Sequence, residues 1–382
     1  MAAKNRSMYG GYTKLQSEAS GFFRLEKING KWWFIDPGGC AFIIIGMNHF
    51  TSSSLRYPDN IHIWRDRYGA SEERWVKEGV AAPLKELGFN TLAWTQELAS
   101  GKWGAPDATF HHTPEWPAEH YKWAKMPYVY TLEFAQIERW NPLAYYPNVF
   151  SSDFADWSDY LAREHCALMA DDPYLIGYAF CAMPGFTKSD FDHVKTWASD
   201  LDLETDAGRK ELTRIVVQYF KVITDAIRRY DSNHLILGDR FNGMNQLTDY
   251  LLEAIAPFID VFSMNLNGVF DEVNPTTEKV ASLTGLPVYM SDSAFLAPTE
   301  LLKVQPGNST YCEDQAERGR KYQEFARKNF KSPHVVGWSW CAYLENRIRC
   351  SGIRNCMDEP YEDCTNLMRE FNEQVYETIL GE

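Results

Sequence analysis

The chain contains eight short apolar runs, and most are followed by a longer stretch with helical periodicity. The runs are rich in Val, Ile, Leu, Phe and Tyr with little alternation, as parallel strands buried on both faces require. They span residues 41–48, 91–94, 128–134, 175–181, 234–241, 261–267, 287–292 and 335–343. The amphipathic stretches span residues 71–87, 156–170, 206–230, 244–256, 313–330 and 361–380. This alternation within 382 residues predicts an α/β fold, a (β/α)8 TIM barrel, in a single domain covering 1–382.

A short N-terminal β-hairpin is expected ahead of the barrel, at about residues 20–36, with the barrel at about 40–380. Asn29-Gly30 lies between two aromatic-containing runs, and this dipeptide is a strong hairpin signal. We expect the hairpin to cap the bottom of the barrel. A doubly wound open sheet is the competing architecture, but it would normally carry a glycine-rich turn after its first strand. Gly38-Gly39 precedes that strand instead.

Charge and composition exclude several classes of partner. The formal net charge is −14 and no basic stretch stands out, which argues against nucleic acid and against an anionic membrane surface. No apolar run approaches the length of a membrane span, and the N-terminus has no apolar signal core. A cytoplasmic protein and a secreted or periplasmic one with its signal removed both stay open. Aromatic residues make up 15% of the chain, which suits a cleft that stacks on sugars.

The eight cysteines show no CxxC pair, so we expect no zinc or redox motif, no metal and no cofactor. Cys312, Cys350, Cys356 and Cys364 fall in or near late loops and could pair in an oxidising compartment. Free thiols are the favoured state. The sequence does not determine the oligomeric state.

Polar residues end most of the predicted strands. Because a TIM barrel forms its active site at the carboxyl ends of its strands, these side chains are expected to gather at one mouth. Each of these side chains, taken alone, is expected to pair with its neighbours and hold a loop in place. Their gathering at one end of the barrel predicts a ligand site. The strand-end candidates include Asn48, His49, Trp94, Gln96, Glu97, Glu133, Asp239, Arg240, Asn242, Asn265, Asn267, Ser291, Asp292, Trp338, Trp340, Tyr343 and Glu345.

Several motifs, in order, resemble those of agarase-type glycoside hydrolases. Residues 30–39 (GKWWFIDPGG) resemble the opening hairpin, 45–49 (IGMNH) the first strand and 87–91 (LGFNT) the approach to the second. Residues 146–150 (YPNVF) resemble the turn before the third long helix, 172–184 (DPYLIGYAFCAMP) the fourth strand and 336–340 (VGWSW) the eighth. The resemblance covers most of the chain and implies a (β/α)8 fold and a β-linked oligo- or polysaccharide as ligand.

Both catalytic positions depart from the family's pattern. The family is expected to place an acid/base glutamate on strand four and a nucleophilic glutamate on strand seven. Here these positions hold Met183 and Asp292. A thioether cannot donate a proton, and the shorter Asp292 carboxylate sits further back than a glutamate's. Retaining hydrolysis needs carboxyl groups only about 5 Å apart, so another acid must supply the proton or the chemistry must differ.

Three hypotheses follow, in this order. The first is a carbohydrate-active enzyme that cleaves a glycosidic bond with Asp292 and a rearranged acid, chosen from Glu97, Glu133, Asp239 or Glu345. The second is a polysaccharide lyase, which needs a base and a group that neutralises a uronate carboxylate. The third is a non-catalytic sugar-binding protein. Candidate suppliers for the lyase are Asn48, His49, Arg240, Tyr289, Arg347 and Arg349.

We assign catalytic roles to Asp292, His49, Asp239 and Glu133. Trp340 is expected to stack on a sugar while Trp338 packs lower in the barrel, and Met183 is expected to line the cleft. The expected substrate-binding residues are Asn48, Trp94, Glu97, Met183, Arg240, Asn265, Asn267, Tyr289, Trp340, Glu345 and Arg347.

Overall fold

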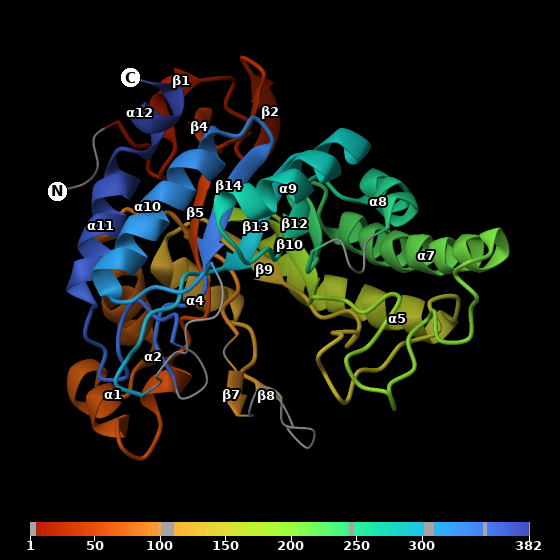
Figure 1. Cartoon of the computed structure of the whole chain (residues 1–382), viewed down its shortest axis with the longest axis horizontal. Helices are drawn as coiled ribbons and strands as arrows, with labels where there is room; N and C mark the ends of the chain where they lie inside the picture. The colour runs from red at the N-terminus through yellow and green to blue at the C-terminus, as the bar shows by residue number, and fades with distance from the viewer. Residues whose placement is uncertain are drawn as a thin grey trace.

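A computed structural model describes residues 5–96, 113–243, 248–301, 309–346 and 350–381, together with the backbone of 98–100 and 111–112. Eight parallel strands form its centre, in the order β11-β10-β9-β6-β5-β14-β13-β12. The ring closes between the two outermost strands, where Phe241 N donates to Ser263 O at 2.9 Å. This confirms the predicted (β/α)8 barrel (Figure 1). The strands are β5 Ile44–Met47, β6 Thr91–Leu92, β9 Tyr128–Thr131, β10 Leu175–Ala182, β11 Leu235–Arg240, β12 Phe262–Met264, β13 Val288–Ser293 and β14 Val335–Trp340.

Helices surround the barrel. The predicted amphipathic stretches all contain helix, but the helices at 61–68, 118–124 and 270–284 were not predicted. The stretch 206–230 forms one long helix, whereas 71–87 is divided by a π-helix at Trp75–Ala81. Among the described residues, no helix combines the length and apolar composition needed to span a bilayer. The α-helices are α1 Ile61–Tyr68, α2 Glu72–Arg74, α3 Ala82–Glu86, α4 Ala118–Ala124, α5 Ser152–Leu161, α6 Ala167–Met169, α7 Asp206–Tyr230, α8 Asp249–Ile255, α9 Phe270–Thr284, α10 Gln315–Lys331, α11 Glu362–Glu373 and α12 Val375–Leu380.

The N-terminal hairpin belongs to a four-stranded antiparallel sheet in the order β1-β4-β3-β2. Asn29 and Gly30 both have positive φ, 51° and 84°, as a tight hairpin turn requires. Trp32 N donates to Pro333 O at 2.9 Å, just before β14 begins, so the sheet covers the amino end of the barrel as expected. In Figure 1 it lies at the upper end of the molecule, opposite the β7–β8 ribbon. These strands are β1 Tyr12–Gln16, β2 Arg24–Ile28, β3 Lys31–Ile35, β4 Cys40–Phe42, β7 Leu98–Ser100 and β8 His111–His112.

Two hydrophobic layers hold the barrel together. A smaller cluster includes Ile44, Ile176, Leu237 and Val336 from the barrel strands and is closed below by aromatic rings of the N-terminal sheet. A larger cluster packs the outer faces of the strands against the helices. Because both faces of each strand are buried, the strands read as continuous apolar runs. Polar side chains are therefore displaced toward the strand ends.

Candidate active site

Irregular pairing marks the carboxyl ends of β10, which ends next to Met183, and of β13, which contains Asp292. Met290 pairs with Trp338 and Ser293 with Trp340, so β13 has one more residue than β14 over this span. The same excess occurs on β10, where Ala179 pairs with Gly238 and Ala182 with Arg240. β-Bulges of this kind re-aim side chains and are common next to active sites. The β13 bulge lies at Asp292.

The Asp292 carboxylate is the hub of the site. Asn48 Nδ2 donates to Oδ1 at 2.9 Å and also to the carbonyl of Ser291 at 2.9 Å. Arg240 Nη2 donates to Oδ2 at 2.7 Å. Asn48 Oδ1 in turn accepts from Trp94 N at 3.1 Å, so residues from strands one, two, five and seven converge on one carboxylate. Asp292 keeps 8% of its surface exposed, so it is held in place and still reaches the mouth.

Aromatic rings flank this hub. The Arg240 guanidinium lies over the Trp94 ring, with 4.0 Å between its Cζ and the ring centroid. The His49 ring packs near the same indole, with centroids 4.9 Å apart. Tyr289 lies below, buried in the barrel, where its hydroxyl bonds to Ser339 Oγ at 2.5 Å. Tyr289 therefore forms part of the floor and is not positioned to meet a large ligand.

Glu133 follows β9 and is only partly buried. Leu132 N donates to Ala179 O at 2.9 Å, which extends the β9–β10 pairing and brings Glu133 beside the end of strand four. Burial raises the pKa of the Glu133 carboxyl, while a hydrogen bond from the Gln96 side chain works against the increase. A carboxyl with a raised pKa keeps its proton to a higher pH than a free glutamate does.

Two further glutamates at this end were not singled out from the sequence. Burial raises the pKa of Glu115 to about 8, partly opposed by hydrogen bonds from Tyr121 and Thr95. Burial also raises the pKa of Glu138 to about 8, with the nearby Glu133 charge adding to the increase. Neither residue ends a predicted strand, so strand-end logic could not find them. The one available signal was a charged residue between the apolar Ile137 and the aromatic Trp140, at Glu138.

Met183 lies at the junction of strands four and five. Its amide donates to Arg240 O at 2.7 Å, and its carbonyl accepts from Arg139 N at 3.0 Å. Its φ of 50° is a left-handed conformation, uncommon for a non-glycine residue and frequent at functional sites. The side chain is partly buried. That Met183 lines a sugar cleft stays a prediction.

Asp239 does not lie with Asp292, which corrects the expectation of a direct catalytic role. Its Oδ1 accepts from Tyr219 Oη of α7 at 3.1 Å and from Cys181 N at 2.9 Å, and the residue is fully buried. Gly238 has φ of 65° and lies at a register shift, which turns Asp239 toward α7 and Arg240 toward the interior. A two-residue alternation read from the sequence could not anticipate this shift. Burial raises the pKa of Asp239 to about 7.

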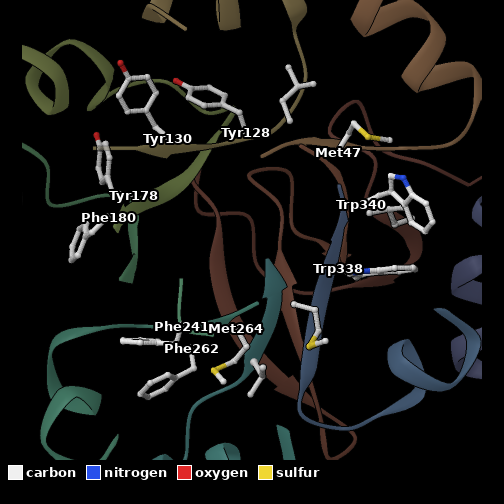
Figure 2. Close-up of a cluster of buried hydrophobic side chains, with 14 of the residues drawn as sticks. Met47, Tyr128, Tyr130, Tyr178, Phe180, Phe241, Phe262, Met264, Trp338 and Trp340 are labelled. Atoms are coloured by element: carbon white, nitrogen blue, oxygen red, sulfur yellow. The ribbon is translucent and has the colours of Figure 1, made fainter. Parts of the chain in front are cut away.

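Trp340 also departs from the expectation, because it packs in the core and does not face the mouth. Figure 2 shows Trp338 and Trp340 among the buried side chains around the barrel. The Trp340 ring lies 5.6 Å from that of Tyr322 of α10, and its Nε1 donates to Ser351 O at 2.9 Å. With 1% exposure it cannot stack on a sugar. Both tryptophans point toward the helices, while Ser339 between them points inward.

The remaining candidates are dispersed. Asn265 is buried and its amide helps close the barrel, whereas Asn267 is exposed. Glu345 is buried, accepts from Tyr361 Oη and has a pKa raised by burial. A role for these three in sugar binding stays a prediction. Glu97, Arg347 and Arg349 lie outside the described residues.

His49, Asp292 and Cys341 converge at the mouth. One ligand-type atom from each lies within 4.8 Å of the other two. The His49 Nδ1 meets the carbonyl oxygen of Gln96. Cys341 is partly exposed and, like the other seven cysteines, is not part of a disulfide. No sequence pattern predicted this group, because the three residues come from strands one, seven and eight.

A surface pocket opens beside Glu115. Its wall combines hydroxyl groups, a cation and an aromatic ring. It is lined by Thr51, Ser52, Ser53, Arg56, Glu72, Thr113, Pro114, Glu115, Trp116, Pro117 and His120.

Comparison with known proteins supports the resemblance seen in the sequence. No family model matches the chain. The chain is 22% identical to beta-agarase B of Vibrio sp. (strain JT0107) over 97% of its own length and 50% of that protein's. The chain thus spans about half of the curated relative.

Solved structures agree on the fold. The agarase AgWH50C superposes with a TM-score of 0.76 at 18% identity, covering 98% of this chain and 66% of that one. An exo-beta-agarase superposes with a TM-score of 0.75 at 18% identity, covering 99% of this chain and 69% of that one. A Bacteroides uniformis beta-glucuronidase superposes with a TM-score of 0.58 at 12% identity, covering 93% of this chain and 37% of that one. The chain therefore carries the (β/α)8 fold of the agarase-type glycoside hydrolases, which it resembles in sequence and in structure.

Proposed function

We propose that this chain is a glycoside hydrolase that cleaves a β-linked oligo- or polysaccharide, with Asp292 as nucleophile and Glu133 as proton donor. The observation that carries the proposal is the Asp292 carboxylate. It lies at a bulge at the end of strand seven and is oriented by Asn48 and by Arg240. The bulge supports the view that backbone geometry offsets the shorter side chain.

The proposed reaction has two steps. Asp292 attacks the anomeric carbon, the bond to the leaving sugar breaks, and the Glu133 proton passes to the leaving oxygen. Water then attacks the glycosyl–Asp292 ester. Glu133 takes one proton from that water, and the freed carboxylate and the second sugar are released.

Glu133 is favoured over the other acids on position. Asp239 faces α7, and Glu138 is 5% exposed, with hydrogen bonds from Cys181 and Asn141. Glu133 retains partial exposure and lies one strand away from Met183. Its raised pKa suits a group that must be protonated when the bond breaks.

Agarose is the first substrate to test, because the curated relative is named a beta-agarase. Trp94 and the pocket beside Glu115 supply an aromatic ring and hydroxyl groups of the kind that bind sugars. Incubation with agarose and neutral oligosaccharides should release reducing ends. Asp292→Asn should stop the release, whereas Asp231→Asn at the other end of the barrel should leave it intact.

One observation favours a lyase as second candidate. Within the described part of the chain, Arg240 Nε and Nη1 have no hydrogen-bond partner. Two unused guanidinium N–H groups could bind a uronate carboxylate. Elimination would add near-ultraviolet absorbance from the new conjugated double bond, and hydrolysis would not. Neither reducing ends nor absorbance, across neutral and acidic glycans, would leave a sugar-binding protein.

A further inference from the structure

We propose that His49, Asp292 and Cys341 form a binding site for Zn²⁺ or a similar borderline divalent cation. The inference goes beyond the proposed function, because metal binding can be measured without substrate. Its starting observation is the convergence of three ligand-type atoms within 4.8 Å of one another.

The ligand set decides the class of ion. Imidazole and thiolate are the donors that zinc and its neighbours prefer, whereas calcium and magnesium take oxygen ligands. Three protein ligands with a fourth position left to water or substrate is the arrangement of open zinc sites. Tetrahedral zinc bonds of about 2.0–2.3 Å place ligands roughly 3.4–3.7 Å apart. The group therefore needs side-chain shifts of roughly 1 Å to close on an ion.

The imidazole is already oriented. A carbonyl oxygen can only accept a hydrogen bond, so the contact with Gln96 O places the His49 proton on Nδ1. In the neutral ring the lone pair is then on Nε2. Metal-ligating histidines are commonly oriented in this way by a carbonyl or carboxylate partner.

The carboxylate is oriented as well. Asn48 and Arg240 fix the two Asp292 oxygens at 2.9 and 2.7 Å, and each oxygen keeps a second lone pair. The Arg240 charge opposes a cation, and this cost is offset when Cys341 binds as a thiolate. Binding therefore releases a proton and should weaken at low pH. Cys341 is partly exposed, which provides a route for the ion.

Alkylation mapping on the unmodified protein provides the test. The described thiols include one matched control: Cys356 is also partly exposed but belongs to no such group. The protein is treated with iodoacetamide with and without ZnCl₂, and modification of each cysteine is followed by peptide mass spectrometry. At ten times the dissociation constant, Cys341 should react about tenfold more slowly while Cys356 is unchanged.

A second measurement identifies the ligands. Co²⁺ in place of Zn²⁺ should give a thiolate charge-transfer band, which Cys341→Ser should remove and Cys356→Ser should keep. Isothermal titration with ZnCl₂ should show binding weakened at least about tenfold in His49→Gln. Unchanged Cys341 alkylation at saturating zinc, or a cobalt band that survives Cys341→Ser, would overturn the proposal. If the protein binds zinc but cleaves no glycan, the proposed metal site is retained and only the proposed glycosidase activity is rejected.

Discussion

The two ends of the barrel both bury ionisable groups, but only one end satisfies them. At the amino end, Asp231 accepts from Tyr178 Oη and His234 Nδ1, both at 2.6 Å, and from two backbone amides. His234 Nε2 bonds to Asp172 O at 2.9 Å. Every polar atom of this cluster therefore has a partner within the described chain.

At the carboxyl end the polar atoms are only partly satisfied. Among described residues, Arg240 Nε and Nη1, Glu115 Oε2 and Glu138 Oε2 are buried without a hydrogen-bond partner. Leaving buried polar atoms unpaired costs about 1–3 kcal/mol each unless water or a ligand binds them. The amino end therefore serves stability, whereas the carboxyl end retains hydrogen-bonding capacity for a ligand. The pKa shifts agree with this contrast between the two ends. The pKa values of Glu115 and Glu138 are raised by burial, whereas the pKa of Asp231 is lowered, because hydrogen bonds from His234 and Tyr178 outweigh burial.

The largest expected effect tests the two aspartates against each other. Asp292→Asn should lower kcat at least about 10³-fold, because it removes the nucleophile. Asp231→Asn should keep kcat but lose about 3 kcal/mol of unfolding free energy, because it breaks a buried ion pair. Reducing-end kinetics and urea denaturation measure the two quantities. Normal turnover in Asp292→Asn would remove Asp292 from the mechanism and abolish the functional contrast between the ends.

The next effect separates the two tryptophan environments. Trp340→Ala should cost about 3–5 kcal/mol of stability, because it opens a cavity against α10. Trp94→Ala should instead lower kcat/KM for the glycan about tenfold, through a lost contact of roughly 1.4 kcal/mol. Denaturation midpoints and glycan-cleavage kinetics of both variants show which tryptophan contributes to stability and which to glycan binding. A Trp340→Ala protein of normal stability with weakened glycan binding would restore the original expectation for this residue.

Glu133 gives the third comparison. Glu133→Gln should lower kcat about 10²–10³-fold on a polysaccharide, because no proton is donated to the leaving oxygen. An aryl glycoside with a good leaving group should be much less affected. Glu138→Gln serves as the matched variant, because burial also raises the pKa of Glu138. If Glu138→Gln shows the larger loss, the proton donor is Glu138 and the assignment to Glu133 is wrong.

The smallest effect is in the pH dependence of stability. Glu138, with a pKa of about 8 when folded and about 4.3 when unfolded, holds its proton in the folded state alone between these values. Unfolding free energy should therefore fall as pH rises from about 5 to 8. Glu138 contributes roughly 1 kcal/mol per pH unit to this slope, beside Glu115 and Asp239, and Glu138→Gln should reduce the slope by that share.

Asp231 should act in the opposite direction, because its folded pKa is lowered. Its contribution is present above the unfolded pKa of about 3.9 and is lost as pH falls below that value. Urea midpoints across pH 3–8 measure both windows. A flat profile from pH 5 to 8 in the unmodified protein would show that Glu138 is ionised.

Much of the fold followed from the sequence. Seven of the eight apolar runs, the Asn29-Gly30 turn and the stretch 206–230 became the expected elements, whereas the run 41–48 divides between β4 of the N-terminal sheet and β5 of the barrel. Burial on both faces leaves a direct mark on composition, and a tight turn restricts residue type, so local patterns were sufficient. The convergence of Asn48, Arg240 and Asp292 was also expected in outline, because the carboxyl ends of parallel strands meet.

The direction of individual side chains could not be predicted in the same way. Register shifts beside Gly238 and at Asp292 turned Asp239 toward α7 and placed an extra residue beside Asp292. A strict two-residue alternation makes no allowance for an inserted residue, so the predicted direction of the Asp239 side chain was wrong. Trp340 was misplaced for another reason: the sequence does not show which face of a doubly buried strand meets the helices.

The sequence by itself determined the barrel and its N-terminal cap, because these depend on residue type and local pattern. Only the tertiary structure decided that Glu115 and Glu138 are buried with raised pKa values, and that Cys341 lies near His49 and Asp292. Those proximities join residues distant in the chain. They depend on bulges and loop paths that bring strand ends to within a few ångströms, and no local propensity records such distances.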